Sequence, residues 1–132
     1  MRVKAFSLIE LLVVIGIVAI INIAMFPNFA SIQNTAKEIS SKSLARTIMI
    51  ALEQYYFTNQ DYPDGNNIQI HSIIDILIES DFLQSVPINP FTGNPYSNSD
   101  HSGQILYKKS STSNYLLIGY GNHNEDIIFD YP

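Results

Sequence analysis

The chain has 132 residues, of which 46% are hydrophobic, and its formal net charge is −5 at pH 7. This length fits one domain with an appendage, and because the sequence contains no cysteine, a disulfide framework and a cysteine nucleophile are both excluded. From Asp61 onward nine acidic residues stand against Lys108 and Lys109, so we expect this region to repel phosphate backbones and to bind no nucleic acid.

An apolar segment runs from Phe6 to Pro27, directly behind the short basic tip MRVKA. As a helix, the stretch from Phe6 to Phe26 would be roughly 31 Å long, which matches a hydrocarbon core about 30 Å thick. The basic residues Arg2 and Lys4 precede it, and the positive-inside rule keeps such residues in the cytoplasm. The sequence therefore predicts a single transmembrane helix, 6–27, with the remainder of the chain facing outward.

One carboxylate, Glu10, lies near the start of this apolar segment. An ionised acid inside a membrane costs about 2.5–3.5 kcal/mol on insertion scales, so such residues usually mark a function. The alternative is a plain signal anchor whose acid reaches the interface by snorkelling. A cleaved secretory signal fits less well, because the nearest small-x-small candidate, Asn28 to Ala30, has a poor first residue.

Helical spacing continues beyond Pro27. Apolar and small residues recur at intervals of three to five and predict one amphipathic stripe: Ile32, Ala36, Ile39, Ser43, Ile48, Ala51 and Tyr55, widened by Leu44 and Leu52. The amphipathic half of the helix is thus predicted over 28–58, and a continuous spine from Phe6 to Phe57 would be about 75 Å long. Since proline lacks an amide hydrogen, we expect a kink or local melting near 22–27.

The C-terminal segment, 59–132, predicts a small globular head. TNQDYPDGNN is a turn signal, and Ser72 with Asp75 predicts a capping-box variant that opens a short helix ending near Phe82. VPINPFTGNPY, with three prolines and a glycine, predicts a rigid loop. Three strands are predicted over 104–110, 114–120 and 126–131, so the expected fold class is α+β with a small antiparallel sheet.

The stretch KAFSLIELLVVIGIVAIINIAMFP resembles the class III leader and N-terminal helix of type IV pilins and of the pseudopilins of type II secretion. In that family a short basic leader is removed, the new first residue is usually an N-methylated phenylalanine, a glutamate stands fifth and a proline interrupts the helix. If Phe6 is first, Glu10 is fifth and Pro27 is that proline. The resemblance implies a leader over 1–5, cleavage between Ala5 and Phe6, and N-methylation of Phe6. Ala5 stands where the family nearly always has glycine.

Cleavage would give Glu10 a partner. The free α-amine of Phe6 would lie in a dry core of packed helices, where an uncompensated charge is costly. At about 4 Å and an effective dielectric constant of about 20, opposite charges attract by roughly 4 kcal/mol. We therefore expect Glu10 of one subunit to neutralise the Phe6 amine of another, so that Phe6, Glu10 and Pro27 form the predicted assembly residues.

The order of elements is similar to the pilin fold along the whole chain, and LEQYYFTNQDYP and GNPY look like the major pseudopilin. This resemblance implies a homopolymeric filament that drives protein export. The implied partners are a prepilin peptidase, an inner-membrane assembly platform and minor pseudopilins. The implied location is the bacterial inner membrane, with the head periplasmic, or extracellular once in a filament. The alternative is a major or minor type IV pilin that serves adhesion, motility or DNA uptake.

Two further predictions concern metal and catalysis. Asn122, Asn124 and Asp126 place oxygen ligands at alternate positions, which suits Ca²⁺, and major pseudopilins bind calcium in the corresponding loop; a solvated turn is the alternative. The sequence contains no G-x-S-x-G elbow and no glycine-rich phosphate cradle, so we expect no enzyme. A membrane-tethered enzyme or a tethered binding module that never polymerises remains the rival interpretation.

Overall fold

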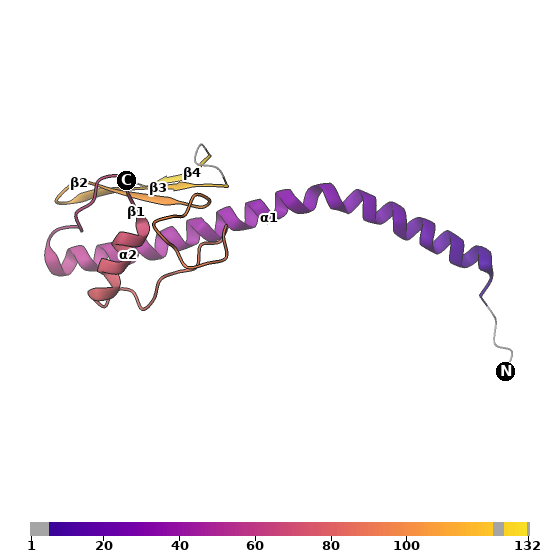
Figure 1. Cartoon of the computed structure of the whole chain (residues 1–132), viewed down its shortest axis with the longest axis horizontal. Helices are drawn as coiled ribbons and strands as arrows, with labels where there is room; N and C mark the ends of the chain where they lie inside the picture. Colours follow the sequence, from indigo (N-terminus) through magenta and orange to yellow (C-terminus); the bar gives the residue numbers. More distant parts are fainter. Residues whose placement is uncertain (1–5, 123–125, 132) are drawn as a thin grey trace. The chain divides into compact units, whose positions relative to one another are not determined.

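The computed structural model describes residues 6–122 and 126–131, apart from the side chains of 24–28 (Figure 1). The elements in chain order are α1 (Leu8–Asn59), β1 (Ile68–Gln69), α2 (Ile70–Glu79), β2 (Ile105–Ser111), β3 (Asn114–Tyr120) and β4 (Ile127–Tyr131). The predicted α+β class is confirmed. The chain divides into two compact units, Met1–Thr35 and Ala36–Pro132, and each is described by itself.

Helix α1 contributes residues to both units and contains 52 residues. Polar side chains within it bond to the preceding turn, as when Asn22 Nδ2 donates to the carbonyl of Val18 at 2.7 Å and Thr47 Oγ1 donates to that of Ser43 at 3.3 Å. These bonds satisfy polar groups without interrupting the helix. The backbone stays helical across 22–27, so the local melting expected there is absent, whereas the kink stays a prediction. Among the described residues, no helix combines the length and the apolar character needed to cross a bilayer.

The end of α1 follows the predicted turn signal. The helix stops at Asn59, and Gln60 takes a positive φ of 58° while its amide donates to the carbonyl of Tyr56 at 2.7 Å. A left-handed residue that closes the last turn is a common helix terminus. The break near residue 58 is therefore confirmed.

Helix α2 begins earlier than predicted. Its first residue is Ile70, and the residue before it, Gln69, makes no side-chain cap hydrogen bond. The predicted capping residue Ser72 instead donates its hydroxyl to Asn98 Oδ1 at 3.2 Å. The capping-box prediction is wrong because burial of Ile70 in the core favours a helix that already includes it.

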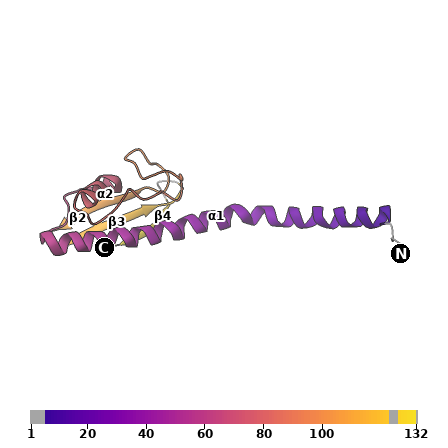
Figure 2. The same ribbon diagram turned by 90° about the horizontal axis from the view of Figure 1, so that it is seen from below.

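The sheet has four antiparallel strands in the order β1-β2-β3-β4. The three predicted strands are present to within one residue at either end, and β2 and β3 form a hairpin. Strand β1 was missed: it is only two residues long, and Ile68 pairs with Tyr107. In Figures 1 and 2 the C-terminal part of α1 and helix α2 lie on one side of this sheet.

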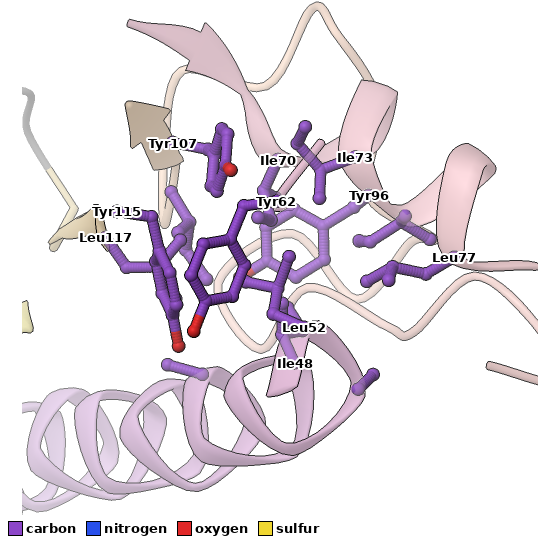
Figure 3. Close-up of a cluster of buried hydrophobic side chains, with 14 of the residues drawn as sticks. Ile48, Leu52, Tyr62, Ile70, Ile73, Leu77, Tyr96, Tyr107, Tyr115 and Leu117 are labelled. Atoms are coloured by element: carbon purple, nitrogen blue, oxygen red, sulfur yellow. The ribbon is translucent and has the colours of Figure 1, made fainter. Parts of the chain in front are cut away.

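The core of unit Ala36–Pro132 lies between the helices and the inner face of the sheet (Figure 3). The helices contribute Ala45, Ile48, Ala51 and Leu52 from α1 and Ile70, Ile73, Ile74 and Leu77 from α2. The sheet contributes alternate residues: Ile105, Tyr107, Tyr115, Leu117 and Phe129. Gly119 permits the packing of Phe129 on β3, because a Cβ at Gly119 would lie 2.2 Å from the Phe129 ring.

The buried face of α1 differs from the predicted stripe. Ile48 and Leu52 are fully buried as expected, but Ile39 is 62% exposed and Ser43 is exposed as well. The predicted stripe contained a step of five residues between Ser43 and Ile48, which rotates the direction of the side chain by roughly 140°. The single predicted stripe therefore combined residues from two different faces of the helix.

Candidate assembly site

The predicted assembly residues belong to unit Met1–Thr35. Ala5 lies outside the described residues, and so does the side chain of Pro27, although its backbone belongs to α1. Phe6 and Glu10 are described, and both are exposed. The site can thus be built from Phe6, Glu10 and their neighbours in the first turns of the helix.

Glu10 is held by its own chain. The backbone amide of Ser7 donates to Glu10 Oε2 at 3.0 Å. Because α1 begins at Leu8, Ser7 is the residue that caps the helix and Glu10 is the third helical residue, so this bond is one half of a capping box. The pattern Ser-x-x-Glu is visible in the sequence, but the prediction from the sequence was an intersubunit role for Glu10, with a snorkelling acid as the alternative, and did not include a capping role.

The capping bond has an electrostatic consequence. The first amides of a helix lack partners within the helix and carry a partial positive charge, which favours a carboxylate in the first turn. Glu10 occupies that turn and orients one of its two oxygens toward the Ser7 amide. The chain itself therefore orients the carboxylate in a defined direction.

The surroundings of Glu10 are apolar. A hollow of about 380 Å³ is lined by Phe6, Ile9, Glu10, Val13 and Val14. Phe6 is 82% exposed and Ile9 65%, and the large apolar side chains that follow as far as Ile23 are exposed to a comparable degree. A contiguous apolar surface of this extent marks an interaction with a membrane or with another protein. The Glu10 carboxylate therefore borders an apolar surface whose removal from water is favourable.

The head holds a second group of charged and polar side chains, in unit Ala36–Pro132. Glu53 Oε1 accepts the hydroxyls of Tyr62 at 2.9 Å and Tyr115 at 3.4 Å. The pKa of Tyr62 is raised to about 12, mainly by burial and to a smaller extent by the hydrogen bond to Glu53. Burial also raises the pKa of Tyr115. These tyrosines therefore stay protonated at neutral pH and attach α1 to the turn after it and to β3.

Lys109 lies beside a polar hollow of about 390 Å³ between the turn at Asp64 and the β2–β3 hairpin. Its ammonium contacts Asp61 Oδ1 at 2.8 Å and Asp64 Oδ1 at 2.8 Å. The hydrogen bonds that this ammonium donates to Asp61 and Asp64 raise the pKa of Lys109, so its amine stays charged at neutral pH. A lysine in this state is a poor nucleophile, and we assign the hollow a structural role.

The proline-rich loop is organised by Asn89, which is fully buried. Its Nδ2 donates to the carbonyl of Ser102 at 2.8 Å and to Asp100 Oδ2 at 3.1 Å, while its Oδ1 accepts the amide of Phe91 at 2.9 Å. Tyr96 donates its hydroxyl to the carbonyl of Gly103 at 3.1 Å. These bonds fix the loop from within. The sequence predicted a rigid loop from its prolines, but nothing in the sequence identified Asn89 as its centre.

The predicted calcium loop is described only at its two ends. Asn124 lies outside the described residues, and the side chains of Asn122 and Asp126 are both exposed. The amide of Gly121 donates to the carbonyl of Asp126 at 2.8 Å, and the carbonyl of Asn122 accepts the hydroxyl of Ser102 at 3.1 Å. Within residues 6–122 and 126–131, no three His, Asp or Glu side chains are grouped as metal ligands. Two exposed side chains do not make the six to eight oxygen ligands of calcium, and the calcium site stays a prediction.

Comparison of the chain with protein-family models, with curated proteins and with solved structures finds no match in any of the three. The functional assignment therefore rests on the sequence pattern and on the geometry of the two units.

Proposed function

We propose that this chain is a structural subunit of a type IV pilus-like filament with the pilin fold, acting as the major pseudopilin of a type II secretion system. The observation that carries the proposal is the position of Glu10, a carboxylate in the first turn of a helix whose surrounding side chains are apolar and exposed. A single acid in such a surface calls for a cationic partner once the surface is covered.

That partner is the α-amine of Phe6 on a second copy, which cleavage after Ala5 would create. One carboxylate oxygen of Glu10 accepts the Ser7 amide, so the carboxylate is already oriented when the second copy arrives. The hollow beside it, lined by Phe6, Val13 and Val14 among others, offers an apolar environment in which the ion pair is stronger than in water. Assembly then buries the apolar surface and neutralises its one acid in the same step.

Before assembly, the apolar segment over 6–27 is held in the bacterial inner membrane with its basic tip in the cytoplasm. The basic residues Arg2 and Lys4 support this orientation, since positive charges stay on the cytoplasmic side. The head is then outside the cytoplasm, where it serves no catalytic purpose in this proposal. The partners are further copies of the chain, a prepilin peptidase, an assembly platform and minor pseudopilins.

The test is a combined analysis of the N-terminus and of the assembled state of the full chain. Mass spectrometry of the protein from membranes is expected to find a mature N-terminus at methylated Phe6. Shearing of the producing cells is expected to release the same species as polymer. Recovery of chains that begin only at Met1, together with absence of polymer, would contradict the proposal. Polymer in the sheared fraction of cells that lack a type II secretion machine would reassign the chain to a surface pilus.

A further inference from the structure

A stack of tyrosine rings runs through the core of unit Ala36–Pro132. Tyr56 and Tyr62 stack with their ring centroids 4.7 Å apart, and Tyr62 meets Tyr115 edge to face at 4.7 Å. Tyr115 in turn stacks on Tyr107 at 5.9 Å. Tyr62, Tyr107 and Tyr115 are buried in the same part of the core (Figure 3), whereas Tyr56 is only partly buried. The stack therefore connects the surface of the head with its core.

The three buried rings differ in the group that accepts their hydroxyl proton. Tyr107 donates to the backbone carbonyl of Pro63 at 2.8 Å. Tyr62 and Tyr115 both donate to Glu53 Oε1, at 2.9 Å and 3.4 Å. A carboxylate is a base that can take up the proton, whereas a backbone carbonyl accepts only the hydrogen bond. Glu53 therefore makes proton transfer from this stack possible.

The distances favour Tyr62 as the residue that transfers its proton. A base within about 2.6–3.2 Å of a hydroxyl oxygen can take its proton directly, so Tyr62 meets this condition and Tyr115 does not. In the resting protein the proton stays on Tyr62, because burial and the hydrogen bond to Glu53 raise the pKa of Tyr62 to about 12. Loss of an electron reverses this preference, since an oxidised phenol is a strong acid. The two partners are thus arranged for the loss of an electron and a proton together.

We infer that Tyr62 is a one-electron redox site, with Glu53 as its proton acceptor and Tyr56 as the ring through which its electron leaves. The oxidant is a soluble one-electron acceptor of high potential, either a peroxyl radical or an oxidising metal complex. It takes one electron from Tyr56, an electron from Tyr62 replaces it, and the Tyr62 hydroxyl proton moves to Glu53. The products are a neutral tyrosyl radical, a protonated carboxyl group and the reduced oxidant. One electron from a reductant and the proton from Glu53 restore the starting state.

The surroundings retain the radical on Tyr62. Among the described residues, the phenols that donate to a carboxylate are those of Tyr62 and Tyr115. Oxidised Tyr56 would have to release its proton to water, so the electron vacancy moves on to Tyr62. Tyr62 is only 6% exposed, which keeps its radical from coupling with a second molecule.

The composition of the chain directs oxidation to this unit. The sequence contains no cysteine and no tryptophan, whose side chains compete with tyrosine for the loss of one electron. All eight tyrosines lie in unit Ala36–Pro132. A purely structural stack would need no carboxylate, since the carbonyl of Pro63 satisfies the hydroxyl of Tyr107. The redox site belongs to the head alone and is independent of the proposed filament.

Flash photolysis of the full chain in detergent tests the site, with photogenerated tris(bipyridyl)ruthenium(III) as the oxidant. We expect a tyrosyl radical that is identified by its electron paramagnetic resonance spectrum and persists in the folded protein. Tyr62→Phe preserves the ring but removes the hydroxyl, so it is expected to abolish the persistent radical and to give dityrosine-linked dimers through exposed rings. The matched control is Tyr96→Phe, because Tyr96 is 2% exposed but donates to the carbonyl of Gly103 at 3.1 Å. This control is expected to leave the radical unchanged.

Two further variants test the proton acceptor and the path of the electron. Glu53→Gln keeps a hydrogen-bond acceptor but no base, and is expected to slow formation of the radical roughly tenfold to a hundredfold. Its control is Glu79→Gln, the same change of charge at an exposed residue of α2. Tyr56→Phe is expected to slow formation without changing the lifetime of the radical, and its control is Tyr55→Phe, whose ring contacts Phe82 at 6.0 Å. An unchanged rate in Glu53→Gln or Tyr56→Phe would overturn the role assigned to that residue.

A persistent radical in Tyr62→Phe, or loss of the radical in Tyr96→Phe, would overturn the inference. Spin trapping and peptide mapping of the unmodified chain locate the radical without any substitution, so the test holds even for a variant that does not fold. The trapped radical is expected in the peptide that contains Tyr62, and trapping on Tyr120 or Tyr131 alone would also overturn the inference. None of these measurements depends on polymer, so the proposed function is tested separately.

Discussion

The two compact units differ in whether their apolar side chains are buried within the chain. In unit Met1–Thr35 the described apolar residues are exposed, Leu8 by 79% and Ile23 by 75% for example. In unit Ala36–Pro132 fifteen apolar and aromatic residues form one buried core. Helix α1 belongs to both, so the same element is unburied in one unit and packed in the other. The apolar side chains of the second unit are buried by the chain itself. Those of the first unit can be buried only by a partner or a membrane.

This contrast predicts that changes in the two units affect different properties of the protein. A change in the first unit removes contacts that the isolated chain does not make, so it leaves the folded head unaffected. A change in the core of the second unit reduces the free energy of unfolding directly. The exposed side chains of Ile39, Ile50 and Phe57 on α1 are the exception, because they lie in the second unit and yet are not part of its core.

The largest effect is expected from Glu10→Ala. Removal of one member of a buried ion pair typically costs about 3–5 kcal/mol, so filaments are expected to be lost while the head melts at an unchanged temperature. The measurements are sheared polymer per cell and thermal unfolding of the full chain. The matched variant is Glu10→Gln, since glutamine preserves a capping box but carries no charge. Filament loss in both variants supports the ion pair. Normal filaments in Glu10→Gln would show that Glu10 serves the helix start alone.

A smaller effect is expected from Leu52→Ala, and it is an effect on the stability of the head and not on the filament contact. Leu52 is fully buried, and truncation of such a residue costs about 2–5 kcal/mol through lost burial and the cavity left behind. The matched control is Ile50→Ala two residues away, which is 61% exposed and is expected to change the free energy of unfolding by less than about 0.5 kcal/mol. Thermal unfolding of the full chain in detergent, followed by the near-ultraviolet dichroism of its tyrosines, provides the comparison. Equal destabilisation by the two variants would contradict the assignment of the two faces of α1.

The proline-rich loop is expected to lose about 1–3 kcal/mol in Asn89→Ala, because the amide of Phe91 and the carbonyl of Ser102 lose their partner in a buried site. Limited proteolysis is expected to cut this loop faster in the variant, and the melting temperature of the head is expected to fall. Asn94→Ala, at an exposed residue of the same loop, is the control. A loop that stays protected in Asn89→Ala would show that the prolines alone make it rigid.

The last prediction is a loss of stability of the head at alkaline pH, which does not occur at neutral pH. All eight tyrosines belong to unit Ala36–Pro132, and burial raises the pKa of Tyr62 and of Tyr96 from 10.0 to about 12. Above pH 10 the unfolded chain therefore binds fewer protons than the folded one, and the stability that these tyrosines contribute below pH 10 is lost as the pH rises to about 12. Phenolate absorbance is expected to rise with loss of the head's dichroism, and Tyr62→Phe is expected to reduce the loss. Ionisation of all eight tyrosines near pH 10 in the intact fold would contradict this picture.

The sequence by itself predicted most of the helices and strands and singled out Glu10. Hydrophobic spacing predicted α1 to within two residues at either end and β2, β3 and β4 to within one, because a period of 3.6 or 2 residues is a local property. Glu10 could be identified because an acid in an apolar run is conspicuous without any tertiary information. The Ser7–Glu10 capping bond was also readable, since its two partners are three residues apart.

Only the tertiary structure decided which face of α1 is buried. A helix with two apolar lines offers either one to a core, and the choice of Ile48 and Leu52 over Ile39 depends on where the sheet and α2 pack. The same dependence explains β1, whose two residues form a strand only because β2 lies beside them, and the role of Asn89, whose partner Ser102 is thirteen residues away. Contacts between distant residues are set by packing, which the local pattern of a sequence does not contain.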